Sequence, residues 1–228
     1  MKNYRSTAIT FGIFFIIAFL TYGTGSALIA SIAESPDFLT EIYANSSTLV
    51  IGVILIALVH TFVNIGLPVV MMPLLKKFNK TLSYGYLSAA IAATTVAVVG
   101  TVFTLLLIPL SAEYIQAGYA NGLKFTAIGN LLVQAGSYSY YISMAIWGIG
   151  GLLFVSVLFI SKLVPSFFPI WGAIGYAIFI AGMVLELFGF KIGVLLSLPG
   201  GLFEIGLSIL LIAKGFRKTA IDKLSNSH

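Results

Sequence analysis

Six long stretches of almost uninterrupted apolar residues follow one another along the chain. They lie at about residues 7–32, 49–75, 86–112, 131–161, 169–190 and 192–213. Each is long enough to cross a bilayer as a helix, which takes about 20 residues. The apolar residues do not alternate with polar ones, and a backbone in lipid must satisfy its own hydrogen bonds, so helices are favoured over barrel strands. We predict an all-α, polytopic transmembrane six-helix bundle.

The composition of the 228-residue chain supports this class of protein. Hydrophobic residues make up 59% of the chain and charged residues 8%, whereas soluble domains carry about 25% charged residues. A water-soluble fold could not bury so much apolar surface, and the short polar connections leave little room for another domain. We therefore expect a single transmembrane domain, residues 1–228.

The basic residues predict the orientation of the bundle, because loops rich in lysine and arginine stay in the cytoplasm. Ten of the twelve basic residues fall on one side of the six predicted helices: Lys2, Arg5, Lys76, Lys77, Lys80, Lys162, Lys214, Arg217, Lys218 and Lys223. Only Lys124 and Lys191 fall on the other. We expect both termini in the cytoplasm, a multi-pass protein of the inner (plasma) membrane, and membrane lipids as partners, with the basic loops near anionic headgroups.

Several classes of chemistry are absent from the sequence. The chain has no cysteine and two histidines, His60 and His228, so it lacks thiolate ligands, a cysteine nucleophile and a histidine cluster. Walker, HExxH and GxSxG motifs are missing as well. The lysines flank apolar runs and do not form a base-reading face. We expect no cofactor, no metal and no nucleic-acid partner.

The second predicted helix carries His60 and Asn64 in the stretch LVHTFVNIGLP. With Pro68 they are spaced by four residues, which places them on one helical face that should point into the bundle. Pro68 removes a backbone hydrogen bond and is expected to kink the helix. Either the two polar residues hydrogen-bond to other helices, or they bind a ligand or relay protons.

Glu186 in the fifth predicted helix borders a row of glycines, Gly175, Gly182 and Gly189, spaced by seven. Small residues let another helix approach closely. One interpretation buries the carboxyl group against that helix as a ligand or proton-exchange group. The other places it near the outer interface, within reach of Lys191.

Glu204 is the sharpest candidate, because a charge near the bilayer centre costs at least about 2.5 kcal/mol. Pro199, Gly200 and Gly201 precede it, and Ser208 follows one turn later. The proline and glycines predict a break in the helix, and broken helices often line ligand sites. The alternative is a carboxyl group that only holds the sixth helix to its neighbours.

The outer half of the fourth predicted helix is polar and aromatic. Gln134, Tyr138 and Tyr141 share a face there, either as part of the aromatic belt at the membrane interface or as the mouth of a binding cavity. The preceding segment, residues 113–130, is expected to be the longest connection and to lie in the interface.

Several stretches resemble the bacterial membrane proteins of the domain of unknown function 4386 family. NIGLPVVMMPLLKKFNKTLSYGYLSAA is similar to that family's second helix, inner loop and third helix, SYSYYISMAIWGIGGLLF to its fourth helix, and GLFEIGLSILLIAKG to its last. The resemblance implies six helices and no established chemistry. It aligns Glu204 with an acidic position and Asn64 with a position that is often polar or acidic. An arginine frequent early in the family's third helix is replaced here by Ser88, Ala89 and Ala90.

These observations favour binding or transport of a small lipophilic or weakly cationic molecule within the bundle. The candidate ligand-binding or proton-exchange residues are Glu204, His60, Asn64, Glu186, Tyr138, Tyr141 and Gln134. So small a bundle would need to form a homodimer to transport. Two alternatives stay open: an intramembrane enzyme acting on a lipid or isoprenoid through Glu204 and His60, which is less favoured, and an accessory or structural membrane subunit.

Overall fold

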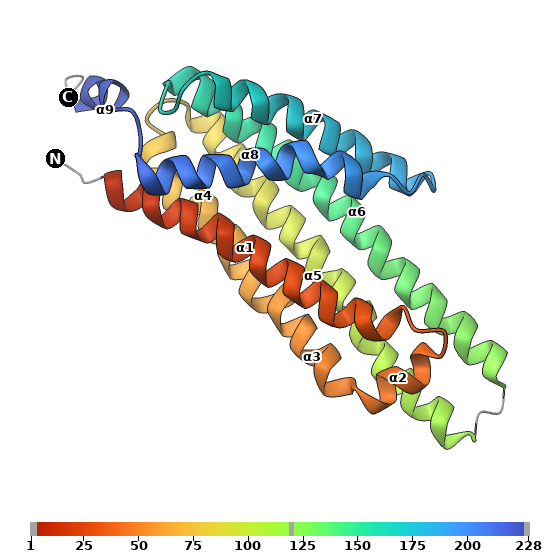
Figure 1. Ribbon diagram of the computed structural model, residues 1–228. Helices are drawn as coiled ribbons and strands as arrows, with labels where there is room; N and C mark the ends of the chain where they lie inside the picture. The colour runs from red at the N-terminus through yellow and green to blue at the C-terminus, as the bar shows by residue number, and fades with distance from the viewer. Residues whose placement is uncertain (1–3, 119–120, 226–228) are drawn as a thin grey trace. The chain divides into compact units, whose positions relative to one another are not determined.

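The computed structural model describes residues 4–118 and 121–225, and within them it contains helices and no strand (Figure 1). The elements in chain order are α1 (Tyr4–Ala33), α2 (Phe38–Ala44), α3 (Ser46–Ile54), the π-helix η1 (Leu55–His60), α4 (Thr61–Leu75), α5 (Lys80–Gln116), α6 (Gly122–Ser161), α7 (Phe167–Leu187), α8 (Gly193–Ala213) and α9 (Lys218–Ser225).

Six of the helical stretches are long and apolar enough to cross a membrane, which confirms the predicted fold class. They are Tyr4–Ala33, Ser46–Leu75, Lys80–Gln116, Gly122–Ser161, Phe167–Leu187 and Gly193–Ala213. The second of them joins α3, η1 and α4 without interruption. Large apolar side chains such as Phe62, Leu131 and Val194 point outward, as expected for surfaces that contact lipid.

The connection predicted at residues 113–130 is wrong. Residues 113–116 end α5 and residues 122–130 begin α6, so most of the predicted connection is helical. Between the two helices Gly118 and Asn121 adopt positive φ angles of 60° and 57°, where glycine and asparagine are favoured. The residues that precede Gly118 and follow Asn121 therefore extend α5 and α6 instead of forming a loop.

Three shorter elements were missing from the sequence prediction: α2, η1 and α9. In the connection after α1, the helix α2 buries Phe38, Leu39 and Ile42. These residues join a hydrophobic cluster that includes Leu49 and Leu107. Burial of this apolar side explains why a short helix forms at a position where the sequence predicts only a polar loop.

The chain divides into two compact units. Among the described residues, unit 1 comprises 4–17, 63–94 and 141–225, and unit 2 comprises 18–62 and 95–118 with 121–140. The long helices α1, α5 and α6 and the helix α4 contribute residues to both units. The single domain expected from composition stays a prediction.

Within unit 1, α7 and α8 lie side by side (Figure 1). A Cβ atom at Gly175 would lie 2.9 Å from the Cα of Gly200, and one at Gly182 would lie 2.7 Å from the Cβ of Leu196. The predicted close approach at these two glycines is confirmed. Gly189 instead lies beyond the end of α7 with φ of 87°.

The predicted break at Pro199 is wrong, because α8 runs continuously from Gly193 to Ala213 with Pro199 inside it. Membrane helices tolerate proline where neighbouring groups compensate for the lost backbone hydrogen bond. Gly200 serves the contact with α7 and does not interrupt the helix. The glycine beside the proline is thus explained by packing.

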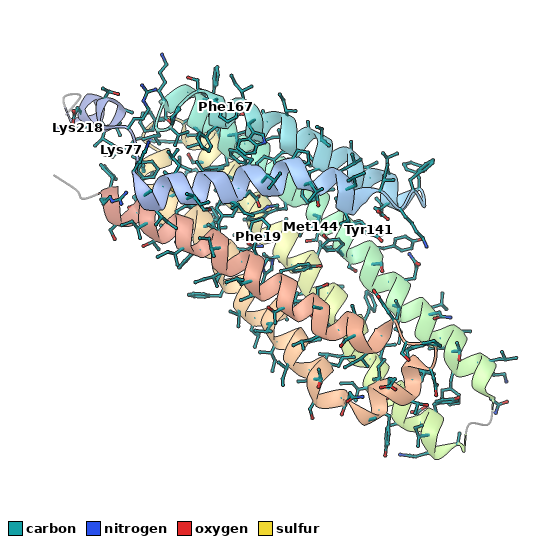
Figure 2. All side chains as sticks on the ribbon, in the orientation of Figure 1. Phe19, Lys77, Tyr141, Met144, Phe167 and Lys218 are labelled. Carbon is teal, nitrogen blue, oxygen red and sulfur yellow. The ribbon has the colours of Figure 1, made fainter. Side chains whose placement is uncertain are left out.

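The start of α1 is tied to the end of α8 in unit 1. The Arg5 guanidinium donates hydrogen bonds to the carbonyl oxygens of Leu211, Ile212 and Ala213 at 3.1, 2.6 and 3.2 Å. Carbonyls in the last turn of a helix lack intrahelical partners, and a cation there also suits the helix dipole. This end of unit 1 carries Lys77 and Lys218 as well (Figure 2).

Candidate functional site

Glu204 lies at the middle of α8, so about 15 Å of helix separate it from either end. Such a position falls near the midplane of a bilayer whose hydrocarbon core is about 30 Å thick. The side chain is buried, with 8% of its surface exposed. An ionisable group at this depth requires partners.

Two aromatic side chains from other helices donate hydrogen bonds to one oxygen of Glu204. The Tyr176 hydroxyl, on α7, lies 2.6 Å from Oε1, and the Trp147 indole nitrogen, on α6, lies 3.2 Å from the same atom. The predicted neighbour Ser208 bonds to the main-chain carbonyl of Glu204 at 2.7 Å and does not reach the carboxyl group. The carboxyl group therefore joins three helices of unit 1.

The second carboxyl oxygen of Glu204, Oε2, receives no hydrogen bond from the described residues. It is also not among the completely enclosed polar atoms without a partner, which in this part of the chain are Thr40 Oγ1 and Tyr86 Oη. None of the described residues forms an ion pair with Glu204. Because both donors to Oε1 are neutral, an ionised carboxylate would keep its full charge and one oxygen for a further partner.

Aromatic rings surround this carboxyl group. Tyr176 packs edge-on against Phe203, with ring centres 5.7 Å apart, and Tyr86 lies 6.5 Å from Trp147 and 5.0 Å from Phe154. A side chain at Gly151 would overlap the Tyr176 ring, so glycine at this position makes room for the phenol. The result is a polar centre in an aromatic shell, a combination that suits organic cations.

His60 lies in unit 2, at the end of η1. Its Nδ1 lies 3.1 Å from the carbonyl oxygen of Ala18, and its ring lies 5.2 Å from that of Tyr22, which stacks on Tyr140. A carbonyl only accepts hydrogen bonds, so Nδ1 carries the hydrogen and the neutral ring keeps its lone pair on Nε2. Short π-helical segments occur frequently at functional sites. His60 and Glu204 belong to different units.

Asn64 is buried in α4, with 4% of its surface exposed, and Pro68 is buried one turn later. His60 is buried as well, so all three residues of the predicted face point into the protein. The helix continues through Pro68 to Leu75. Asn64 is not a hydrogen-bond partner of the Glu204 carboxyl group, whose described donors are Trp147 and Tyr176.

Glu186 acts at a helix end. Its Oε1 accepts a hydrogen bond of 2.7 Å from the main-chain nitrogen of Gly193, the first residue of α8. Nitrogens in the first turn lack intrahelical partners, and negative charge suits this end of a helix. Within the described part, Glu186 contacts this main-chain group and forms no ion pair with Lys191.

The polar face predicted on the fourth span lies on α6, before Trp147 in the chain. Gln134 and Tyr138 are exposed in unit 2, and Tyr141 is half-buried in unit 1, where Figure 2 labels it together with Met144 on α6. Whether this face belongs to the aromatic belt or to the mouth of a binding cavity stays a prediction.

Sequence reasoning missed Trp147, Tyr176 and Tyr86, the aromatic partners of the Glu204 site. A signal was present on α6, where Ser143, Trp147 and Phe154 are spaced by four and seven residues and share a face. All three are buried, and the Ser143 hydroxyl donates to the Ala93 carbonyl at 2.8 Å. No comparable pattern marks Tyr86 or Tyr176 before the packing of the helices is known.

Comparison with known families places this arrangement in context. A family model described as Domain of unknown function (DUF4386) matches residues 10–215. The chain belongs to this family. The DUF4386 match includes Glu204 and all three aromatic partners, while the family's description assigns no chemistry to them. No curated protein and no solved structure matched the chain.

Proposed function

We propose that this multi-pass membrane protein binds a small lipophilic, weakly cationic molecule at Glu204 within unit 1, as a carrier or receptor. The observation that carries the proposal is the asymmetry of the buried carboxyl group. Oε1 accepts two hydrogen bonds from neutral donors, and Oε2 accepts none from the described residues. A buried carboxylate without a compensating charge is costly, so a cationic ligand would supply the missing partner.

The surroundings of Glu204 support the same ligand class. The rings of Tyr86, Trp147 and Tyr176 offer aromatic faces, which attract cations at about 0.5–2 kcal/mol each. They also exclude polar uncharged molecules that could not satisfy their own hydrogen bonds. Transport would use the position of Glu204 near the middle of its span, where substrate sites of transporters commonly lie.

A structural role is the second candidate, and a specific observation favours it. The carboxyl group joins α8 to α6 and α7 through Trp147 and Tyr176. Such interhelical hydrogen bonds stabilise membrane bundles by about 0.6–2 kcal/mol each. In an accessory subunit this cross-link would be the whole purpose of Glu204, and no ligand would be required.

Native mass spectrometry of the detergent-purified protein beside Glu204→Gln separates the two candidates. The glutamine keeps an oxygen that accepts from Tyr176 and Trp147 but removes the negative charge. We expect a small molecule at fixed stoichiometry in the parent and its loss in the variant. Glu186→Gln is the matched control, because it makes the same change at a helix cap, and it should retain the molecule.

Two results would contradict ligand binding. One is an empty protein in both samples after extraction into mild detergent. The other is equal occupancy in the parent and Glu204→Gln. Either result, together with unchanged thermal unfolding of the variant, would assign Glu204 to the helix cross-link. The masses of intact complexes also test the expected homodimer.

We further propose that both termini face the cytoplasm of the inner membrane. Exposed basic side chains near α4, α6 and α8 support this orientation through the positive-inside rule. These are Lys76, Lys77, Lys80, Lys162, Lys214, Arg217 and Lys218. Since the chain has no cysteine, single cysteines at Thr219 and Ser47 can be labelled with an impermeant maleimide in intact cells. Labelling of Ser47→Cys alone is expected, and the reverse pattern would overturn the orientation.

A further inference from the structure

The Tyr86 hydroxyl has no hydrogen-bond partner among the described residues although it is completely enclosed. Tyr86 is 2% exposed, and its Oη is one of two such atoms in the described part of the chain. Buried tyrosine hydroxyls normally find a partner, and leaving one without costs about 1–3 kcal/mol. This group therefore calls for a partner that the described protein residues do not provide.

The Tyr86 ring is held in place beside the Glu204 site. It stacks on Phe154 at 5.0 Å and lies 6.5 Å from Trp147, the same indole that donates to Glu204. A Cβ at Gly150 would approach its ring at 3.7 Å. Two oxygens without a hydrogen-bond partner among the described residues, Tyr86 Oη and Glu204 Oε2, thus occur around one tryptophan.

We infer that Tyr86 is the second polar anchor of the ligand held by Glu204, and that this ligand is a primary amine. A primary ammonium group carries three N–H donors, enough to reach both the carboxylate and the phenol oxygen. A quaternary ammonium group has charge but no donor and would leave Tyr86 unsatisfied. A metal ion is less suited, since no group of three acidic or histidine side chains that could hold one occurs among the described residues.

This inference rests on the proposed function and adds the chemical class of the ligand. Ligand affinity then has two contributions. One is the positive charge, which any ammonium group provides, and the other is hydrogen bonding to Tyr86, which requires an N–H group. The Tyr86 hydroxyl should distinguish between amines that differ only in N-methylation. Tyr176 should not, because its hydroxyl is already committed to Oε1 of Glu204.

Trp147 provides the measurement. The chain has two tryptophans, so Trp171→Phe leaves Trp147 as the only tryptophan fluorophore, within the proposed site. The probes are octylamine and octyltrimethylammonium, which have the same octyl chain and differ in N-methylation. Each is titrated in detergent into the Trp171→Phe protein. The titrations are repeated with Tyr86→Phe, Tyr176→Phe or Glu204→Gln added to that protein. Gel filtration and circular dichroism establish that each protein is folded.

We expect Tyr86→Phe to weaken octylamine binding about five- to tenfold, the effect of one hydrogen bond, and to leave octyltrimethylammonium unchanged. Tyr176→Phe should affect both probes alike, and Glu204→Gln should abolish both signals. Octylamine binding that survives Glu204→Gln, or is absent from the parent, would overturn the proposed function and this inference with it. If Glu204→Gln abolishes binding while Tyr86→Phe leaves octylamine affinity unchanged, or weakens both probes equally, only the inference fails. In those cases a buried water or simple packing accounts for the phenol.

Discussion

Each unit buries an acidic or basic side chain of the membrane spans, Glu204 in unit 1 and His60 in unit 2, and the two side chains have different partners. In unit 1 the Glu204 carboxyl group accepts hydrogen bonds from two side chains on two other helices. In unit 2 the His60 ring meets the main-chain carbonyl of Ala18 and packs beside Tyr22. Glu204 thus accepts from side-chain donors, whereas the His60 ring contacts a main-chain carbonyl and an aromatic ring.

This difference indicates where ligand chemistry is more readily accommodated. A main-chain carbonyl is fixed by its own helix, so the Ala18 contact locks the position and tautomer of His60. Side-chain donors can rotate away at a modest cost, and Glu204 keeps one oxygen unused by the described residues. A polar group with adjustable partners and spare capacity suits binding, whereas a group fixed to the backbone suits structure.

Removal of the Glu204 carboxyl group should have the largest effect on stability. Glu204→Ala leaves the Tyr176 hydroxyl and the Trp147 indole without their acceptor and opens a cavity, so we expect a loss of about 3 kcal/mol in the free energy of unfolding. Denaturation with sodium dodecyl sulfate, followed by circular dichroism, measures it. Glu204→Gln keeps an acceptor and should lose less than about 1 kcal/mol. Equal losses in the two variants would show that hydrogen bonding is not what holds this side chain.

Substitutions at the contact between α7 and α8 test how tightly the helices around Glu204 are fixed. Gly175→Ala places a methyl group 2.9 Å from the Gly200 backbone, and we expect it to destabilise the protein by about 2 kcal/mol. Gly23→Ala is the matched control in a helix of unit 2, because nothing lies within 4 Å of the added Cβ. It should be neutral or slightly stabilising. A tolerated Gly175→Ala would mean that α7 and α8 separate easily.

Much of the fold follows from the sequence because lipid imposes a simple rule. Long apolar runs must be helices, and all six were found from that rule alone. Apart from the break predicted at Pro199, the errors concern segments outside the long apolar runs. Residues 122–130 are polar enough to predict a loop yet continue α6, and α2 forms because Phe38, Leu39 and Ile42 pack into a cluster that no local pattern reveals.

The candidate site was predictable only in part. Glu204 could be predicted because a carboxyl group in the middle of a membrane span is costly. Its partners lie on α6 and α7, far from Glu204 in the sequence, so the sequence does not show that they are close to it. Pro199 and Gly200 were misread, since a proline next to glycine predicts a broken helix and in fact accompanies close packing. Tyr86 carries no sequence signal at all, because an unsatisfied hydroxyl is recognised only once its surroundings are known.

The His60 contact should contribute less than Glu204 to stability. His60→Phe keeps a ring beside Tyr22 and removes the hydrogen bond to Ala18, so we expect a loss of about 1 kcal/mol in the same denaturation assay. Phe62→Leu, at a position 72% exposed, is the control in unit 2 and should change stability by less than about 0.5 kcal/mol. A loss from His60→Phe as large as that from Glu204→Ala would erase the contrast between the two buried groups.

Glu186 completes the series with the smallest effect, and it tests whether position or residue type makes Glu204 special. Its carboxyl group caps the first nitrogen of α8, where water and headgroups at the end of the span can replace a lost acceptor. We expect Glu186→Ala to lower the free energy of unfolding by about 0.5 kcal/mol, the low end of the values for helix caps. Glu186→Gln should match the parent, since its amide oxygen still accepts from Gly193. If Glu186→Ala instead proves as damaging as Glu204→Ala, then α8 depends on its cap as much as on its mid-span cross-link, and depth in the membrane no longer explains the importance of a carboxyl group in this protein.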